Sequence, residues 1–444
     1  MKTFIKSKYA LILLAVTLLI SCETDFENPN SATDEQVFSS REGIFAATVG
    51  MRQLYSTNGL RFIIETPAIT TREGGITTTF QNMIELEDGG ANLPNFNSNV
   101  QGLWFNLLRV MKLSEDIINA TPTIELEDGT ASGLIAYAKL FKAICIGGLS
   151  QHYENVIIQT SNDNQAQFVS RIEGYQEAIR LLNEALSEIQ NNLISDEFID
   201  EILKGEIDLE NSILAMLARF NLFAGNYDAA ITSANNVDLT STSVFTYDDQ
   251  NFNPIWNRVI QGGAPNFKPR DNFGLPDSFV FEGTDGRLSF YLEPDDATNQ
   301  NQLPIEELKG FFDAIDKSIP LYIPDEMNLI IAEANLRKTN PDITAAVSAI
   351  NEVRTDTNDP LGINANIPEY MGPLTVSELL LEVYQNRRAE LFLTGMSLED
   401  SRRFNRPQPS PASQVFSDER NRNFYPYPDT ERNNNPNTPD DPAI

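Results

Sequence analysis

The sequence contains few of the residues that perform thiol, acid–base or metal chemistry. Two cysteines, Cys22 and Cys145, and one histidine, His152, occur among 444 residues. A disulfide framework is therefore excluded, as is a zinc site or catalytic pair built from several histidines of one chain. A catalytic triad that uses His152 stays formally possible, but no GxSxG stretch offers a nucleophile elbow.

Positive charge is also scarce. The chain has 32 lysines and arginines against 63 aspartates and glutamates, which gives a formal net charge of −31. Such a charge repels the phosphates of nucleic acids and of anionic membrane surfaces, so we expect no nucleic-acid partner. It does not prevent attachment through a lipid, because physiological salt screens the field within about 8 Å.

The N-terminus carries the features of an export signal. Lysines precede an apolar run that ends at Ile20 and is shorter than the roughly 20 residues needed to span a bilayer. The stretch "LISC" at 19–22 resembles the bacterial lipobox, which implies cleavage before Cys22 and lipidation of that residue; the alternative is an ordinary secretory signal followed by a chance cysteine. We assign 1–21 to the signal and the polar residues 22–40 to a tether.

Apolar residues recur at steps of three and four along several stretches, which predicts helices with one buried face. One such stripe consists of Ile172, Tyr175, Ile179, Leu182, Leu186, Ile189 and Leu193, and another of Leu134, Ala138, Phe141, Cys145 and Leu149. We therefore expect Cys145 to be buried and His152, beyond the second stripe, to have a capping or packing role. A further helix is predicted at 375–394, where Thr375 and Glu378 fit a capping box.

Several predicted helices form pairs joined by tight turns. One pair flanks Gly225-Asn226, and another flanks "KTNPD" at 338–342. Such pairs are tetratricopeptide-type units, which bury their apolar faces by stacking on neighbouring units. The sequence therefore predicts a mainly α fold, a tetratricopeptide-like helical superhelix with long irregular loop regions and a few short strands.

The pattern also predicts how one domain, 41–444, is divided. We expect a helical scaffold at about 41–57, 103–237 and 323–404, irregular ligand-side insertions at about 58–102 and 238–322, and a surface tail at 405–444. Irregular regions of this length usually carry function or local sheet.

Longer motifs resemble those of a known family. They include "LWFNLLRVMKLSEDIINA" at 103–120, "AMLARFNLFAGNYDAAITSANNV" at 215–237, "IPDEMNLIIAEANLRK" at 323–338 and "LTVSELLLEVYQNRRAELFLTGMSLEDSRRF" at 374–404. With the lipobox, they resemble the SusD/RagB family of Bacteroidota outer-membrane lipoproteins over nearly the whole mature chain.

The resemblance implies a function. It implies a lipid-anchored, surface-exposed protein of the outer membrane that binds oligosaccharide or polysaccharide nutrients and delivers them to a SusC-like TonB-dependent transporter, without catalysis. The RagB branch suggests peptides as the alternative ligand, which the low tryptophan content fits. A glycoside hydrolase and a pure protein scaffold are two further alternatives.

A sugar ligand would need aromatic rings for its C–H faces and planar polar groups for its hydroxyls. The irregular regions and their borders supply these candidate ligand-binding residues: Arg72, Phe80, Phe96, Asn97, Asn99, Trp104, Trp256, Arg270 and Asp271. For Trp104 the competing interpretation is a core anchor, and for Trp256 packing and stacking are equally supported.

No cofactor and no catalytic residue is predicted, and calcium is the one ion considered. The acidic pairs Asp248-Asp249 and Asp295-Asp296 lack the spacing of a calcium loop, so we expect solvated turns there. A second charged group, formed by Arg387, Arg388, Glu390, Arg402 and Arg403, is interpreted as a structural ion-pair network rather than an anion site.

Overall fold

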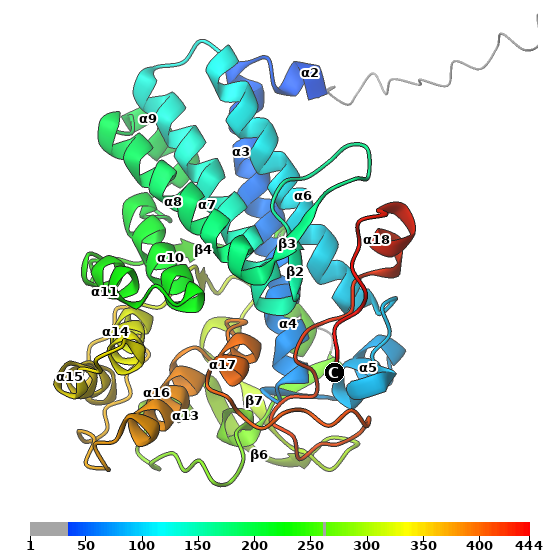
Figure 1. Ribbon diagram of the computed structural model, residues 1–444, viewed down its shortest axis with the longest axis vertical. Coiled ribbons are helices and arrows are strands. Elements are labelled where there is room, and N and C mark those ends of the chain that lie inside the picture. The colour runs from blue at the N-terminus through cyan, green and yellow to red at the C-terminus, as the bar shows by residue number, and fades with distance from the viewer. Residues whose placement is uncertain (1–33, 261–262) are drawn as a thin grey trace, which may run out of the picture.

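The structure, a computed structural model, describes residues 34–260 and 263–444 (Figure 1). The predicted signal 1–21, the predicted lipidation site Cys22 and the tether up to residue 33 lie outside the described residues. In the described part, the fold is mainly α-helical and its sheets are short and two-stranded, as the sequence predicted.

Long helices from the first half of the chain lie side by side (Figure 1). They are α3 (Arg41–Leu54), α4 (Leu60–Thr70), α6 (Ser98–Ala120), α7 (Asp128–His152), α8 (Arg171–Asn191) and α10 (Leu209–Ala224). Helix α7 contacts both α6 and α8. It is long and apolar enough to cross a membrane, but 89% of its most apolar 18-residue window is buried inside the protein, so it is the central helix of the core.

The predicted helix pairs are present. Helix α10 pairs with α11 (Tyr227–Asn235), and α14 (Asp325–Arg337) pairs with α15 (Ile343–Thr355). Gly225 ends α10 with a φ of 82°, which glycine adopts without steric cost. Stacked against α14 and α15 is α16 (Val376–Glu390), which α17 (Ser397–Arg403) follows along the chain.

The predicted helix 375–394 corresponds to α16. The Thr375 hydroxyl accepts a hydrogen bond from the Glu378 N–H, as one half of a capping box requires. The helix ends at Glu390 rather than at 394, because the turn that follows it places Leu393 in the left-handed region, with a φ of 54°.

The remaining elements are short. The helices are α2 (Asp34–Val37), α5 (Gln81–Asp88), α9 (Asp196–Phe198), α12 (Trp256–Val259), α13 (Gly286–Tyr291) and α18 (Asp429–Asn434), with π-helical or 3₁₀ turns η1 (Tyr55–Gly59), η2 (Gly90–Asn92), η3 (Thr121–Thr123), η4 (Ile199–Leu203), η6 (Asp271–Gly274) and η7 (Gly310–Phe312). The antiparallel strand pairs are β1 (Gly74–Ile76) with β5 (Phe267–Pro269), β2 (Asn155–Ile157) with β3 (Phe168–Ser170), β4 (Val244–Phe245) with β8 (Ile319–Pro320), and β6 (Leu292–Thr298) with β7 (Pro304–Leu308).

The segment 58–102 is more helical than the sequence indicated. Helix α3 continues through the π-helical turn η1 into α4, which contains Pro67. Gly59 and Pro67 favour a loop by local propensity, but α4 is almost entirely buried. Tertiary packing therefore outweighs propensity here. The segment 238–322, in contrast, is largely irregular with short strands, as predicted.

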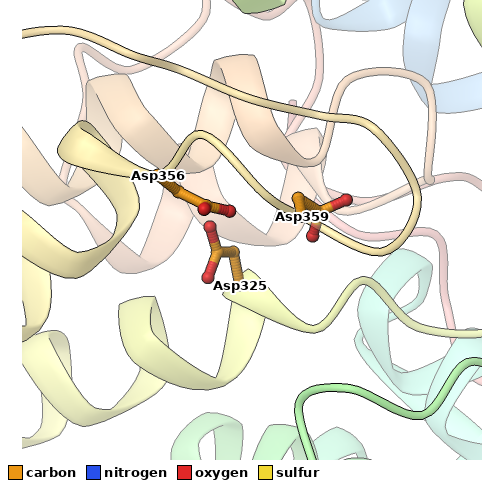
Figure 2. Close-up of side chains that lie close together, drawn as sticks. All are labelled: Asp325, Asp356 and Asp359. Carbon is orange, nitrogen blue, oxygen red and sulfur yellow. The ribbon is translucent and has the colours of Figure 1, made fainter.

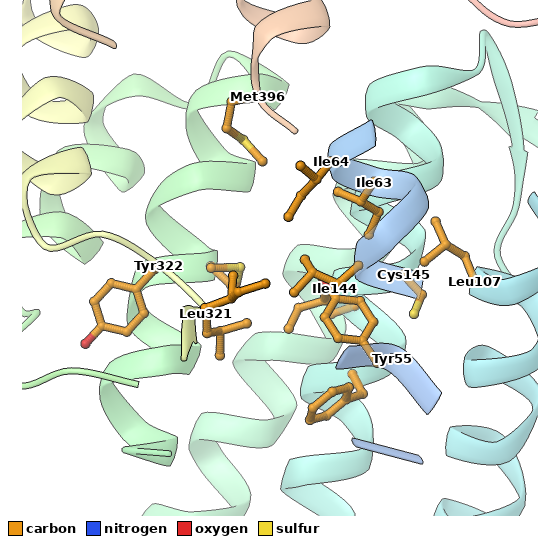
Figure 3. Close-up of a cluster of buried hydrophobic side chains, with 14 of the residues drawn as sticks. Tyr55, Ile63, Ile64, Leu107, Ile144, Cys145, Leu321, Tyr322 and Met396 are labelled. Atoms are coloured by element: carbon orange, nitrogen blue, oxygen red, sulfur yellow. The ribbon is translucent and has the colours of Figure 1, made fainter. Parts of the chain in front are cut away.

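The core is centred on α7. Figure 3 shows Ile63 of α4, Leu107 of α6 and Cys145 of α7 within one apolar cluster. Cys145 is free and completely buried, which confirms the prediction made for it. Helices α7 and α10 approach closely at Gly147, where a Cβ atom would lie 2.1 Å from the Phe220 ring.

Buried ion pairs join the helical layers. Arg219 of α10 and Glu326 of α14 are 8% and 0% exposed, and Arg219 Nε lies 2.8 Å from Glu326 Oε1. The four arginines of the predicted ion-pair network are paired as expected, whereas its one carboxylate, Glu390, pairs with Arg287. The pairs of the network are Arg387 with Asp400, Arg403 with both Asp400 and Glu333, Arg171 and Arg402 with Glu399, and Arg388 with Glu73.

The Arg219–Glu326 pair makes a testable contribution to stability. Substitution Arg219→Met leaves the Glu326 carboxylate buried without its partner, and we expect it to lower the free energy of unfolding by about 3–5 kcal/mol. The matched control Arg180→Met removes an arginine that is 53% exposed at its side chain, and should cost less than about 1 kcal/mol. Urea unfolding followed by circular dichroism measures both, and equal small losses would contradict the assignment.

Candidate functional site

A cleft opens between the N-terminal end of α4 and the loop that precedes α12. Its volume is about 340 Å³. It is lined by Thr57, Asn58, Arg61, Phe62, Gln250, Asn251, Phe252, Pro254 and Asn257. We call it the Phe62–Phe252 cleft. Its lining combines residues at the start of the first predicted ligand-side insertion, 58–102, with residues of the second, 238–322.

One wall of the cleft is formed by η1 and the first turn of α4. A π-helical turn is a rare irregularity that often marks a functional site, and it directly precedes Arg61 and Phe62. The Arg61 guanidinium lies 4.6 Å from the centre of the Phe62 ring, and its Nε donates to Glu65 Oε2 at 3.1 Å. Both side chains are half-buried, so each leaves part of its surface for a ligand.

The opposite wall is a loop fixed by its own hydrogen bonds. The Asp248 carboxylate accepts from the backbone N–H groups of Gln250 (2.8 Å) and Asn251 (2.7 Å). Asn253 Oδ1 accepts from the N–H of Trp256 at 3.0 Å and so caps α12. The Trp256 ring contacts Phe252 at a centroid distance of 6.4 Å. Trp256 therefore supports an aromatic residue of the cleft.

A buried ion pair holds the two walls together. Glu65 of α4 is 0% exposed, and its Oε1 accepts from Arg258 Nη2 of α12 at 2.7 Å. Arg258 Nε lies 3.0 Å from Glu65 Oε2. Because the fork is bidentate, it fixes the orientation of α12 against α4 as well as their separation.

The chemistry of the lining is that of recognition. Two phenyl rings offer flat apolar faces, four amide side chains offer donors and acceptors, and Arg61 offers a planar cation. Among the lining residues there is no carboxylate, histidine or cysteine. The described cleft therefore contains no pair of groups for general acid–base or nucleophilic catalysis.

A second cleft of about 360 Å³ lies between residues 280–287 and 367–386. Its arginines are already paired: Arg354 donates to Glu382 at 2.6 Å and to Glu282 at 2.8 Å, and Arg287 donates to Asp285 at 2.7 Å. The lining of this second cleft also contains the carboxylates Glu282, Asp285, Glu369 and Glu382, whereas the Phe62–Phe252 cleft has none, so the latter is the better candidate for an uncharged ligand.

Four of the predicted ligand-binding residues are buried. Arg72, Asn97, Asn99 and Trp104 are at most 2% exposed. Asn97 caps α6 by accepting from the Asn99 and Val100 N–H groups. Trp104 is the core anchor that the sequence offered as its alternative role, and its indole N–H donates to Glu431 at 3.1 Å.

Arg72 fastens the C-terminal tail. Its guanidinium donates to the carbonyl oxygens of Glu87 (2.8 Å), Val415 (3.1 Å) and Asp418 (3.3 Å). Burial lowers the pKa of Arg72 to about 10. Arg72 lies in a segment rich in side chains that could bind a ligand. Its guanidinium instead donates these three hydrogen bonds to backbone carbonyls, so it has a structural role.

The other predicted residues reach the surface. Phe80 and Phe96 are 58% and 62% exposed. They lie near the start of α6, which is held against α5 by the hydrogen bond from the buried Asn97 side chain to the Asn82 carbonyl at 2.9 Å. Trp256, Arg270 and Asp271 are half-buried. Of the predicted set, only Trp256 contacts the Phe62–Phe252 cleft; ligand binding by the exposed residues stays a prediction.

Sequence reasoning missed Arg61, Phe62 and Phe252 as a group. The sequence placed Arg61 and Phe62 in an irregular region. They come close to Phe252 only through tertiary packing, because about 190 residues separate them along the chain. The acidic pairs considered for calcium are turns or strand residues: Asp248 caps its own loop, and Asp295 pairs with Lys268 at 3.5 Å.

The comparisons with known proteins agree with this architecture. No curated protein matches the chain. Residues 326–441 match the model of the SusD family. A solved SusD superfamily protein from Bacteroides vulgatus is 15% identical, with a TM-score of 0.69 over 91% of this chain and 99% of that chain. The chain has the SusD-like fold.

Two further SusD-like structures show the same likeness. A SusD-like carbohydrate binding protein from Bacteroides fragilis is 13% identical, with a TM-score of 0.67 over 90% of this chain and 99% of that chain. A SusD homolog from Bacteroides thetaiotaomicron is 13% identical, with a TM-score of 0.66 over 93% and 99%. The resemblance to the SusD/RagB family that the motifs suggested is thus confirmed.

The role of Arg72 in this SusD-like fold can be tested by Arg72→Ala. It leaves three backbone carbonyls without a charged donor, and we expect a loss of at least about 2 kcal/mol in the free energy of unfolding and faster proteolysis of the tail 405–444. The control Phe96→Ala, at an exposed ring, should change stability by less than about 0.5 kcal/mol. Weakened ligand binding by Arg72→Ala at unchanged stability would instead support a direct ligand role.

His152 is buried and inert in the folded SusD-like chain. Its Nδ1 donates to the Gly148 carbonyl at 2.6 Å and its ring stacks on Tyr425. Burial lowers the pKa of His152 to about 4 from its usual 6.5. This neutral imidazole contributes stability above pH 6.5, and the contribution is lost as the pH falls towards 4, because the unfolded chain binds the proton first.

Since this is the only histidine, its NMR signal needs no assignment by mutation. We expect the imidazole resonances of the folded protein to stay constant from pH 8 to pH 5. In urea they should titrate near the ordinary value for histidine. Titration near pH 6.5 in the folded protein would show that the ring is accessible and would reopen a role in catalysis.

Proposed function

We propose that this protein is a cell-surface lipoprotein that binds oligosaccharide or polysaccharide nutrients and delivers them, chemically unaltered, to a SusC-like TonB-dependent transporter. The observation that carries the proposal is the Phe62–Phe252 cleft, which combines aromatic faces, amides and one arginine on a SusD-like scaffold. This combination suits the apolar faces and hydroxyls of a sugar chain.

The similar structures support the choice of ligand class. The solved protein from Bacteroides fragilis is described as a SusD-like carbohydrate binding protein. The Phe62–Phe252 cleft of the present chain is lined by phenyl rings and amides and by no carboxylate, whereas glycoside hydrolysis needs a pair of carboxyl groups across the scissile bond. We therefore propose binding without turnover.

The anchor and the transporter complete the proposal. The lipobox at Cys22 supports attachment to the outer membrane through acyl chains, each methylene of which contributes about 0.8 kcal/mol when buried in lipid. The strongly acidic body is compatible with such a tether, because it keeps its own surface away from anionic headgroups. The proposed transporter partner and the proposed surface exposure rest on the family resemblance.

A peptide ligand is the second candidate, and one structural observation favours it. Trp104 is completely buried, so Trp256 is the only tryptophan with exposed surface, and it is half-buried. Large polysaccharides are commonly held by broad aromatic platforms, whereas a groove of phenyl rings and amides also suits an extended peptide through side-chain and backbone hydrogen bonds.

The binding site is tested with a pair of phenylalanine variants. Phe252→Ala removes an aromatic face from the Phe62–Phe252 cleft, and we expect affinity for the best glycan of an oligosaccharide panel to fall at least about tenfold, which corresponds to about 1.4 kcal/mol. Phe96→Ala is the matched control, because Phe96 is exposed outside the cleft lining. Isothermal titration calorimetry measures both affinities.

Each other outcome has a defined meaning. Loss of binding in Phe96→Ala but not in Phe252→Ala would move the site to the predicted surface around Phe80 and Phe96. Silence towards the glycan panel, with binding of a peptide mixture, would favour the RagB-like alternative. Release of reducing sugar by the purified protein would refute the non-catalytic assignment.

A further inference from the structure

Three aspartates meet where the end of α15 returns to the start of α14 (Figure 2). Asp325 is the first residue of α14, Asp356 follows the last residue of α15, and Asp359 lies in the loop beyond it. Each offers one carboxylate oxygen, and these oxygens lie within 4.8 Å of one another. This group lies apart from the acidic pairs that the sequence had suggested.

The cluster contains a buried carboxylate oxygen without a partner. Asp325 is 7% exposed, and its Oδ1 accepts from Asn328 Nδ2 at 3.0 Å, but its Oδ2 has no hydrogen-bond partner among the described residues. Figure 2 shows one oxygen of the Asp325 carboxylate facing the Asp356 carboxylate, with the Asp359 carboxylate beside them. An unpaired buried anionic oxygen is costly, so this oxygen is available to a cation.

The neighbouring loop is organised around the other two carboxylates. Asp359 Oδ1 accepts from the N–H groups of Leu361 (2.7 Å) and Ile363 (3.1 Å), and Asp356 Oδ1 accepts from the Asn358 N–H at 2.8 Å. These bonds fix the positions of the carboxylates before any ligand arrives. They also use only one oxygen of the Asp359 side chain, which leaves the other for coordination.

Positive charge near the cluster is insufficient to neutralise it. None of the three aspartates forms an ion pair with a described lysine or arginine, and Arg287 nearby is shared by Asp285 and Glu390. Glu390 is itself completely buried, and its Oε1 also lacks a partner.

We propose that Asp325, Asp356 and Asp359 bind one calcium ion. The donor set consists of oxygen alone, which selects a hard cation over zinc or copper. Calcium binds oxygen at about 2.3–2.6 Å, so two ligand oxygens on opposite sides of the ion lie up to about 5 Å apart, and the separations here fit within that span. Magnesium, at about 2.1 Å, requires a tighter cage.

The ion has a structural consequence. It joins the start of α14 to the loop 356–366, and this loop continues into residues 367–372, which line the second cleft. The Ala365 carbonyl accepts from the Gly286 N–H at 2.9 Å, so the same loop also holds the other side of that cleft. Calcium therefore stabilises the C-terminal helix pair and the wall of the second cleft.

The test uses the whole chain after removal of metals by a chelator, without any glycan. Calcium is added up to millimolar concentration while the melting temperature is followed, and terbium luminescence reports direct occupancy. We expect a saturable rise in melting temperature and terbium emission that calcium displaces. Asp325→Asn and Asp356→Asn should each weaken binding at least tenfold, whereas the matched control Asp296→Asn, at an exposed acidic strand residue, should bind as the unaltered protein does.

The outcomes distinguish calcium binding from neutralisation of the cluster by a shared proton. Asp325→Asn removes a repelling charge and keeps the side-chain shape, so it should fold, and Asp356→Asn provides a second variant at a less buried position. No calcium response in the unaltered protein, or an unchanged response in both variants, would overturn the proposal. A melting temperature that Asp325→Asn raises without any calcium effect in the unaltered protein would show that a shared proton, rather than a metal, neutralises the cluster.

Discussion

A network of buried arginines and carboxylates connects the helical layers of this protein, and the rest of the architecture depends on it. Arg403 of α17 reaches Glu333 of α14 at 2.7 Å and Asp400 at 2.9 Å, and Arg387 of α16 pairs with Asp400 at 2.8 Å. Although burial opposes ionisation, Arg171 and Arg402 lower the pKa of Glu399 to about 2. Removal of one member would leave its partner charged in a dry environment, so these pairs fix relative helix positions rather than simply adding stability.

A buried ion pair also positions the two walls of the candidate binding site. Glu65 and Arg258 join α4 to α12 through a bidentate pair, and the loop that precedes α12 forms the wall of the Phe62–Phe252 cleft opposite α4. The walls are thus positioned by a buried contact, while the cleft itself is lined by aromatic and amide side chains that have no catalytic chemistry. A rigid frame behind a recognition surface suits the proposed capture and release of a nutrient, since binding energy is then not diverted into ordering loops.

The scaffold could be predicted from sequence more completely than the site. Apolar periodicity located α8, α10 and the pair α14–α15, and it correctly buried Cys145, because each of these features depends on residues close together in the chain. It failed at 58–102, where packing keeps the chain helical through Gly59 of η1 and Pro67 of α4. It also overestimated Arg72 and Asn97 as ligand residues, because composition alone does not distinguish a polar group that caps a helix or fastens a tail from one that faces solvent.

Local periodicity and short motifs are enough to establish the helical class, the pairing of neighbouring helices and the family resemblance, and composition alone gives the acidic charge. The tertiary structure alone decided which side chains meet. Phe62 and Phe252 become neighbours across a cleft, and Asp325 joins Asp356 and Asp359, only after the intervening helices have packed. The physical reason is that proximity between distant residues is set by the sum of many weak packing contacts, and no single stretch of sequence records that sum.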